Sequence, residues 1–254
     1  MNNLDGITVL VTGGSSGIGA AAVAALGRAG AYVIVHYGGN QEGAESASMD
    51  IPAHRRHFIS MDLGLPGSAR NLWTRSLAWR GRVDVVVNNA AHYREVKLEQ
   101  RDAEWEAAWA ALVQINLIQA TDLMRYAVEH FLGTGGGTLI TMSSWAAQRG
   151  SSNPALAAYA ATKAGVAAAT KTIARAHARD GVLAYCIAPG VVDTAMSRMS
   201  AASTGGVDAV NAQLAMEEWV PPQEVAELVV FLAEGRCRHL TGATLDVNGA
   251  SYVR

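Results

Sequence analysis

The feature that most constrains the fold is a regular alternation of short apolar runs with longer, often alanine-rich stretches. Strands that alternate with helices are typical of βαβ units, and strands that are apolar throughout indicate a parallel sheet buried on both faces. The expected strands are residues 7–11, 32–35, 56–61, 83–88, 138–143, 183–188 and 244–247. The expected helices are residues 18–29, 41–49, 69–79, 104–133, 157–179 and 223–233. The sequence therefore predicts an α/β fold: a Rossmann-like, doubly wound parallel sheet of about seven strands with helices on both faces.

Neither a linker nor an internal repeat divides the 254 residues, so we expect a single domain over residues 1–254. The one long irregular stretch is residues 193–222, which contains the run SAASTGG and two adjacent prolines, Pro221 and Pro222. Irregular stretches of this length in compact domains are usually functional or disordered. We expect residues 193–222 to form a lid over a substrate pocket.

Charge and cysteine content argue against several classes of protein. Lys and Arg (20) nearly balance Asp and Glu (22). The composition therefore lacks the excess of basic residues that is typical of a nucleic-acid-binding protein. Cys186 and Cys237 are too few for a disulfide framework and lack metal-ligand spacing. The first residues lack the basic segment of a signal peptide, and no uninterrupted apolar window of about 18 residues predicts a membrane helix. We expect a cytoplasmic protein without a metal, nucleic-acid or membrane partner.

A glycine-rich turn, TGGSSGIG at residues 12–19, connects the first expected strand to the first expected helix. Glycines allow the backbone to turn sharply and approach a pyrophosphate, and the helix N-terminus offers free N–H groups and a favourable dipole. The spacing is G-x-x-x-G-x-G rather than the usual G-x-G-x-x-G. Its place between strand and helix indicates a dinucleotide-binding site.

The end of the second expected strand bears on the choice of cofactor. An acidic residue that binds the ribose 2′-hydroxyl of NAD usually lies about 20 residues beyond the loop, but no Asp or Glu lies between Asp5 and Glu42. Residues 36–40 read HYGGN, so no carboxylate repels a 2′-phosphate, although no arginine is present to bind one. Asn40 can cap the next helix, whose N–H groups could receive that phosphate. We expect NADP to be favoured over NAD.

Tyr159 and Lys163 are four residues apart in the expected helix 157–179 and therefore lie on one face of it. A neighbouring ammonium group favours the phenolate and lowers the pKa of a tyrosine. Tyr159 is thus a plausible proton donor or acceptor near neutral pH. A Tyr-x-x-x-Lys pair alone is weak evidence, because such pairs are common on solvated helix faces.

Taken in order along nearly the whole chain, these features resemble the short-chain dehydrogenase/reductase family. The segments that match its motifs are residues 12–19 (TGGSSGIG), Asp62, residues 88–91 (NNAA), Trp109 with Asn116, Ser143 with Ser144, residues 159–163 (YAATK), Pro189 with Gly190, Thr194 and residues 246–249 (DVNG). There are two departures: Ala91 replaces the glycine of the family's NNAG, and Ser144 precedes Tyr159 by slightly more than the common spacing.

The resemblance implies a single dinucleotide-binding and catalytic domain with a tetrad of Asn116, Ser144, Tyr159 and Lys163. Tyr159 would be the acid/base, and Lys163 would lower its pKa and bind the nicotinamide ribose. Ser144 would hydrogen-bond the substrate oxygen, and Asn116 would hold a water in a proton relay. The implied cofactor-binding residues are Gly13, Ser15, Ser16, Gly17, Ile18, Gly19, Tyr37, Asp62, Leu63, Asn89, Ala90, Tyr159, Lys163, Pro189, Gly190, Val192 and Thr194.

The resemblance also implies an NAD(P)-dependent oxidoreductase that interconverts a ketone and a secondary alcohol by hydride transfer. Within the family the sequence is most similar in style to 3-oxoacyl-carrier-protein reductases and sugar dehydrogenases, and members commonly form homotetramers. The alternative is a catalytically silent dinucleotide sensor with the same fold, but such proteins usually lose the tyrosine or the lysine. His92 and Tyr93 could line the mouth of the pocket, although ordinary loop residues are the commoner case there.

Overall fold

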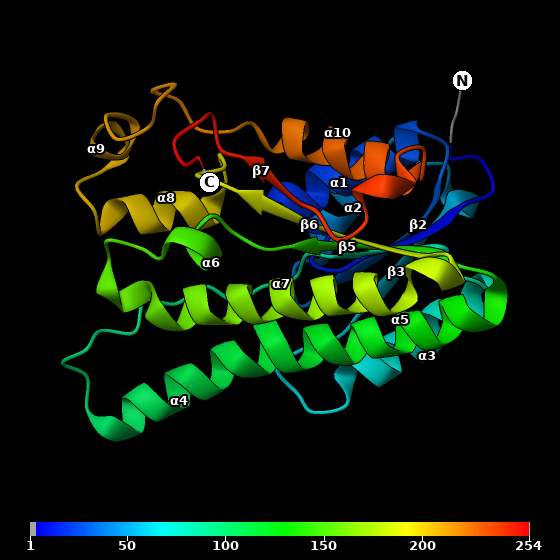
Figure 1. Cartoon of the computed structure of the whole chain (residues 1–254), viewed down its shortest axis with the longest axis horizontal. Coiled ribbons are helices and arrows are strands. Elements are labelled where there is room, and N and C mark those ends of the chain that lie inside the picture. The colour runs from blue at the N-terminus through cyan, green and yellow to red at the C-terminus, as the bar shows by residue number, and fades with distance from the viewer. Residues whose placement is uncertain (1–3, 254) are drawn as a thin grey trace.

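The computed structural model describes residues 4–253, in which seven parallel strands form one sheet in the order β3-β2-β1-β4-β5-β6-β7 (Figure 1). The order reverses beside β1, which pairs with β2 on one side and β4 on the other. Ligands of open α/β sheets bind outside the carboxyl ends of the strands at such a reversal. The strands are β1 (Thr8–Val11), β2 (Tyr32–Tyr37), β3 (Arg56–Ser60), β4 (Val85–Asn88), β5 (Gly137–Met142), β6 (Val182–Pro189) and β7 (Thr244–Val247).

Helices cover both faces of the sheet. They are α1 (Gly17–Arg28), α2 (Gln41–Ala47), α3 (Ser68–Arg80), α4 (Asp102–Val113), α5 (Ala120–Thr134), α6 (Ala146–Arg149), α7 (Ala157–His177), α8 (Ala195–Ala202), α9 (Val207–Asn211) and α10 (Pro222–Ala233). In Figure 1, α1, α2 and α10 lie above the sheet, and α3, α5 and α7 lie below it. Nowhere in residues 4–253 is a helix both long enough and apolar enough to cross a bilayer.

The two faces of the sheet explain why the strands are apolar throughout. Successive strand residues point to opposite faces. Accordingly, Val9 and Val11 pack with Leu26 of α1 in one core cluster, whereas Leu10 packs with Leu72 of α3 in the other. The predicted doubly wound architecture is confirmed, and most predicted boundaries lie within two residues of the observed ones.

The structure differs from the prediction in two segments. The expected helix 104–133 is α4 and α5 joined by a π-helix, η2 (Gln114–Gln119). The stretch 193–222, expected to be irregular, contains α8 and α9. Helices this short depend on tertiary contacts rather than on propensity, so the sequence pattern carries little signal for them. Both ends of this stretch meet at a bridge between Val192 and Val220.

Candidate active site

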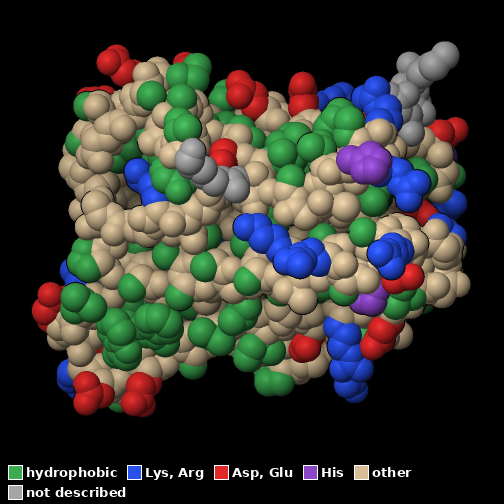
Figure 2. Space-filling model, viewed as in Figure 1, with side chains coloured by type: hydrophobic (Ala, Val, Ile, Leu, Met, Phe, Trp, Pro, Cys, Tyr) green, Lys and Arg blue, Asp and Glu red, His purple; other side chains and the backbone are tan. Residues whose placement is uncertain are grey.

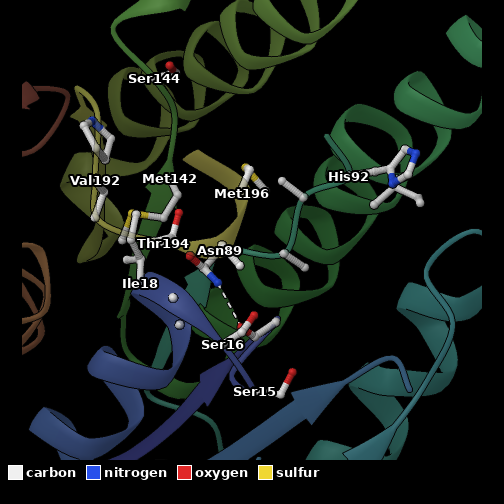
Figure 3. A pocket seen from close by; sticks show the side chains of 18 of the residues that line it. Ser15, Ser16, Ile18, Asn89, His92, Met142, Ser144, Val192, Thr194 and Met196 are labelled. Atoms are coloured by element: carbon white, nitrogen blue, oxygen red, sulfur yellow. Dashed lines mark hydrogen bonds between the residues drawn. The ribbon is translucent and has the colours of Figure 1, made fainter. Parts of the chain in front are cut away.

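A cavity of about 390 Å³ opens at the carboxyl ends of the central strands (Figure 3). Its walls come from the β1–α1 loop, the ends of β2 to β6, and the beginnings of α7 and α8. The sequence-predicted site residues that line it are Gly13, Ser15, Ser16, Gly17, Ile18, Gly19, Asp62, Leu63, Asn89, Ala90, Ser144, Tyr159, Lys163, Pro189, Gly190, Val192 and Thr194. Segments far apart in the sequence are therefore brought to one cavity at the reversal of the strand order.

Two predicted site residues do not line the cavity. Tyr37, expected to bind cofactor, is 8% exposed and packs in the core cluster with Val33 and Val35. Because strand residues alternate in direction, His36 and Gly38 line the cavity and the side chain of Tyr37 points away from it. Asn116 is 2% exposed and lies behind the cavity wall.

The β1–α1 loop forms a tight cradle around the N-terminus of α1. A Cβ atom on Gly19 would lie 2.0 Å from the carbonyl oxygen of Gly13 and 2.6 Å from Nδ2 of Asn89, so only glycine fits there. The first N–H groups of a helix have no partner within it, and those of α1 lie at the cavity. The cradle and these N–H groups fit the pyrophosphate of a dinucleotide.

Thr12 fastens this loop to the end of β4. Its hydroxyl accepts hydrogen bonds from the backbone N–H groups of Asn89 and Ala90, both at 2.9 Å, and donates to the carbonyl of Val87 at 3.4 Å. In return, Nδ2 of Asn89 donates to the carbonyl of Thr12 at 2.8 Å. The β1–α1 loop and the turn after β4, which both line the cavity, are thus held in a fixed position relative to each other.

His36, whose role the sequence analysis missed, supports the same loop from below. Its Nδ1 accepts from the N–H of Gly13 at 3.1 Å, and its Nε2 donates to the carbonyl of Met61 at 3.0 Å. The imidazole is 2% exposed, and burial lowers its pKa to about 4, against a smaller opposing effect of the bond to Met61. His36 is therefore neutral at pH 7 and joins the β1–α1 loop to the end of β3. The available signal was its place in β2, where it faces the cavity two residues before Gly38.

Lys163 is nearly enclosed in α7, with 4% of its surface exposed. Its Nζ donates to the carbonyl of Met142 at 2.8 Å and lies 5.9 Å from the ring centre of Tyr159. Burial lowers the pKa of Lys163 to about 8, so the amine is still mostly protonated at pH 7. The site therefore contains a buried cation beside its tyrosine.

The pKa of Tyr159 departs from the sequence-based expectation. Burial raises it to about 12, and nearby Tyr93 also raises it, while a hydrogen bond with Ser144 lowers it. The expected lowering by Lys163 is not among the effects on this pKa, and burial of the phenolate is the largest of them. Tyr159 therefore keeps its proton at neutral pH in this structure.

The two adjacent serines have different roles in the structure. Ser144 bonds with Tyr159, and its Oγ accepts from the N–H of Ala146 at 3.1 Å. Ser143 instead donates to the carbonyl of Lys163 at 3.1 Å and so fastens β5 to α7. Ser144, the serine of the implied tetrad, is thus the one that contacts Tyr159.

Asn116 lies in the π-helix η2, and its side chain is fully engaged as a donor. Oδ1 accepts from the N–H of His92 at 2.7 Å, while Nδ2 donates to the carbonyl of His92 at 2.9 Å and to Oγ1 of Thr162 at 3.2 Å. Single π-turns within α-helices often occur at functional sites. A water held by Asn116 would have to use its backbone carbonyl or the remaining lone pair of Oδ1.

Comparison with known proteins agrees with this arrangement. Residues 13–250 match the family model described as enoyl-(acyl carrier protein) reductase. The chain is 32% identical over 252 residues to the 3-oxoacyl-(acyl-carrier-protein) reductase FabG of Escherichia coli, covering 99% of both chains. It is 29% identical over 249 residues to the FabG protein of Staphylococcus epidermidis, covering 97% of this chain and 99% of that one.

Solved structures give the same result for the fold. A short-chain dehydrogenase from Burkholderia cenocepacia, in complex with NADP, is similar with a TM-score of 0.88 and 29% identity over 98% of this chain and 99% of that one. A protein from Beutenbergia cavernae, provisionally named an NAD(P)-dependent gluconate 5-dehydrogenase and solved with NADP, has a TM-score of 0.87, 30% identity and 98% coverage of both chains. The chain therefore belongs to the short-chain dehydrogenase/reductase family and is an NAD(P)-dependent oxidoreductase.

Proposed function

We propose that this chain reduces a ketone to a secondary alcohol with NADPH, using Tyr159 as the proton donor. The observation that carries the proposal is the meeting of Tyr159, Ser144 and Lys163 with the glycine cradle at one cavity. When bound, the nicotinamide supplies the hydride. The chain itself supplies binding, orientation and the proton.

The roles of the side chains follow from their protonation and contacts. Tyr159 is protonated at neutral pH because its pKa is raised to about 12, so it can donate a proton from Oη to a carbonyl oxygen that is gaining negative charge. Ser144 bonds with Tyr159 and is placed to hydrogen-bond the same oxygen. The protonated amine of Lys163 stabilises negative charge at Tyr159 after the transfer. Asn116 fixes the backbone of His92 beside the cavity.

The proposed preference for NADP is supported by the residues at the edge of the cavity near α2. Among residues 6–41 the chain carries no carboxylate that would repel a 2′-phosphate. Oδ1 of Asn40 accepts from the N–H of Gly43 at 3.0 Å, so Asn40 caps α2 and leaves other N–H groups of its first turn free for an anion. Two solved relatives bind NADP.

For the substrate, we infer a 3-oxoacyl thioester or a sugar-derived ketone. The named relatives are 3-oxoacyl-(acyl-carrier-protein) reductases and a protein provisionally named a gluconate 5-dehydrogenase. Residues 193–222 would cover this substrate, because α8 begins at the cavity and the bridge between Val192 and Val220 closes the segment on itself.

We also infer a cytoplasmic homotetramer. Figure 2 shows hydrophobic side chains gathered over α4 and the beginning of α7. On α4, Trp105 and Trp109 are half-buried, with ring centres 5.7 Å apart, and pack against the small cluster around Leu112. A second copy of the chain would cover this surface, and light scattering of the purified protein would give the mass of the assembly.

The deciding experiment is a fluorescence titration with NADPH and, separately, with NADH, followed by turnover on a panel of 3-oxoacyl thioesters and sugar-derived ketones. We expect tighter binding of NADPH and reduction of at least one class. A preference for NADH would overturn the choice of cofactor. Tight cofactor binding without turnover on any member of the panel would favour a dinucleotide sensor instead.

A further inference from the structure

The carboxylate of Glu95 connects three segments beside the part of the cavity near Tyr159 and α8, which is called the substrate side. Glu95 lies in the loop between β4 and α4. Its Oε1 accepts from Oγ of Ser203 at 2.6 Å, from Nδ2 of Asn153 at 3.0 Å and, more weakly, from the hydroxyl of Tyr93 at 3.4 Å. Ser203 is the C-cap that follows α8, and Asn153 precedes α7. One side chain therefore joins the β4–α4 loop, the segment before α7 and the stretch 193–222.

Two of these partners are connected with Tyr159, one by a ring contact and the other through the start of α7. The ring of Tyr93 packs edge-on against that of Tyr159, with ring centres 5.7 Å apart and planes at 68°. The hydroxyl of Tyr93 also bonds with Ser200 of α8. Oδ1 of Asn153 accepts from the N–H of Ala155 at 3.0 Å and so caps the short turn from which α7 starts.

We propose that Glu95 is a positioning residue, which holds Tyr93 against Tyr159 and anchors the end of α8 so that the substrate side of the site keeps its shape. The inference rests on the proposed function, in which Tyr159 is the proton donor. A carboxylate suits this role because it only accepts hydrogen bonds and its bonds to neutral donors are strengthened by its charge. Glutamine would bring two donors to a place where three donors already converge.

The first test compares Glu95→Ala with Glu99→Ala, a matched control in the same loop. Glu99 is exposed and makes no side-chain hydrogen bond to any residue between 4 and 253. We expect Glu95→Ala to raise the KM for the carbonyl substrate and lower kcat/KM by about tenfold, the order expected for losing a charge-assisted bond. The Kd for NADPH should stay within about twofold, since Glu95 does not line the cofactor cradle. Glu99→Ala should change neither quantity.

A double-mutant cycle identifies the bond that matters. If Glu95 acts through α8, Ser203→Ala should lower kcat/KM by itself, and the pair Glu95→Ala with Ser203→Ala should lose no more than Glu95→Ala alone. Glu95→Gln should recover only part of the loss. Independent, multiplying losses from the two single variants would overturn the link from Glu95 to α8. Because Ser203 is exposed, Ser203→Ala keeps the proposal testable even if Glu95→Ala fails to fold.

Amide hydrogen exchange provides a measurement that does not depend on turnover. In the free protein, Glu95→Ala should speed exchange in α8 and leave α1 unchanged, because α8 loses an anchor and α1 does not. Unchanged exchange in α8 together with an unchanged kcat/KM would refute the proposal. If the unmodified protein reduces no ketone, the proposed function fails, and the exchange of α8 still decides whether Glu95 anchors that helix.

Discussion

The cofactor side and the substrate side of the cavity are held together by different kinds of bond. On the cofactor side, backbone groups of Gly13, Asn89 and Ala90 bond with the buried side chains of Thr12 and His36. On the substrate side, half-exposed or exposed side chains bond with one another across sequence separations of 58 and 108 residues. The bonds of the cofactor side therefore lie within the sheet and its turns, whereas those of the substrate side join loops and the end of a helix.

The largest expected effect lies where the two sides meet. Replacing Tyr159 with Phe removes the donated proton and keeps the ring that packs against Tyr93. The kcat should fall by about 10² to 10⁴, the range for loss of a general acid. The Kd for NADPH should change little, which a fluorescence titration would check. Substantial remaining turnover would contradict the role of Tyr159.

Gly19→Ala tests the rigidity of the cofactor side. The added methyl group would overlap the carbonyl oxygen of Gly13, so the loop must move. We expect the free energy of unfolding to fall by about 1–3 kcal/mol, and NADPH to bind at least about tenfold more weakly. Gly39→Ala is the matched control, since a Cβ there meets nothing within 4 Å. Equal effects of the two substitutions would show that the cradle is not tightly packed.

Lys163 should make stability depend on pH. Its pKa is about 8 in the folded protein and 10.5 ordinarily, so between pH 8 and 10 the unfolded chain binds more protons and stability rises with pH. Above pH 10 the raised pKa of Tyr159 acts in the opposite direction. Compared with Lys163→Met, the unmodified protein should gain about 1 kcal/mol or more from pH 8 to 10 in urea titrations. Parallel pH profiles would contradict the lowered pKa.

The smallest expected effect is at the exposed edge of the cofactor side. Asn40→Asp keeps the cap on α2, because Asp and Asn cap helices equally well. Stability should therefore change by less than about 0.5 kcal/mol. The new charge should weaken NADPH binding by about fivefold through repulsion of the 2′-phosphate, while NADH binding stays unchanged. Equal losses for both cofactors would place the 2′-phosphate elsewhere.

The difference between the cofactor side and the substrate side also explains which features could be predicted from the sequence. The glycine loop at residues 12–19 was predictable because the residues that form it are adjacent in the chain. Tyr37 was expected at the cofactor from the resemblance alone, but the alternation of β2 turns its side chain into the core and brings His36 to the cavity. Glu95 gave no signal, because its partners Asn153 and Ser203 are distant in sequence and common in loops.

The π-helix between α4 and α5 makes this part of the chain sensitive to length. A π-turn holds one residue more than an α-turn, and each residue turns an α-helix by about 100°. Deleting one residue from Gln114–Gln119 would give a more regular helix, but it would rotate Asn116 away from the backbone of His92 or α4 away from α7. The number of residues in η2 is therefore fixed by the contacts of Asn116 and α4. Helix propensity alone would not reveal this constraint, because a helix usually tolerates a change of length.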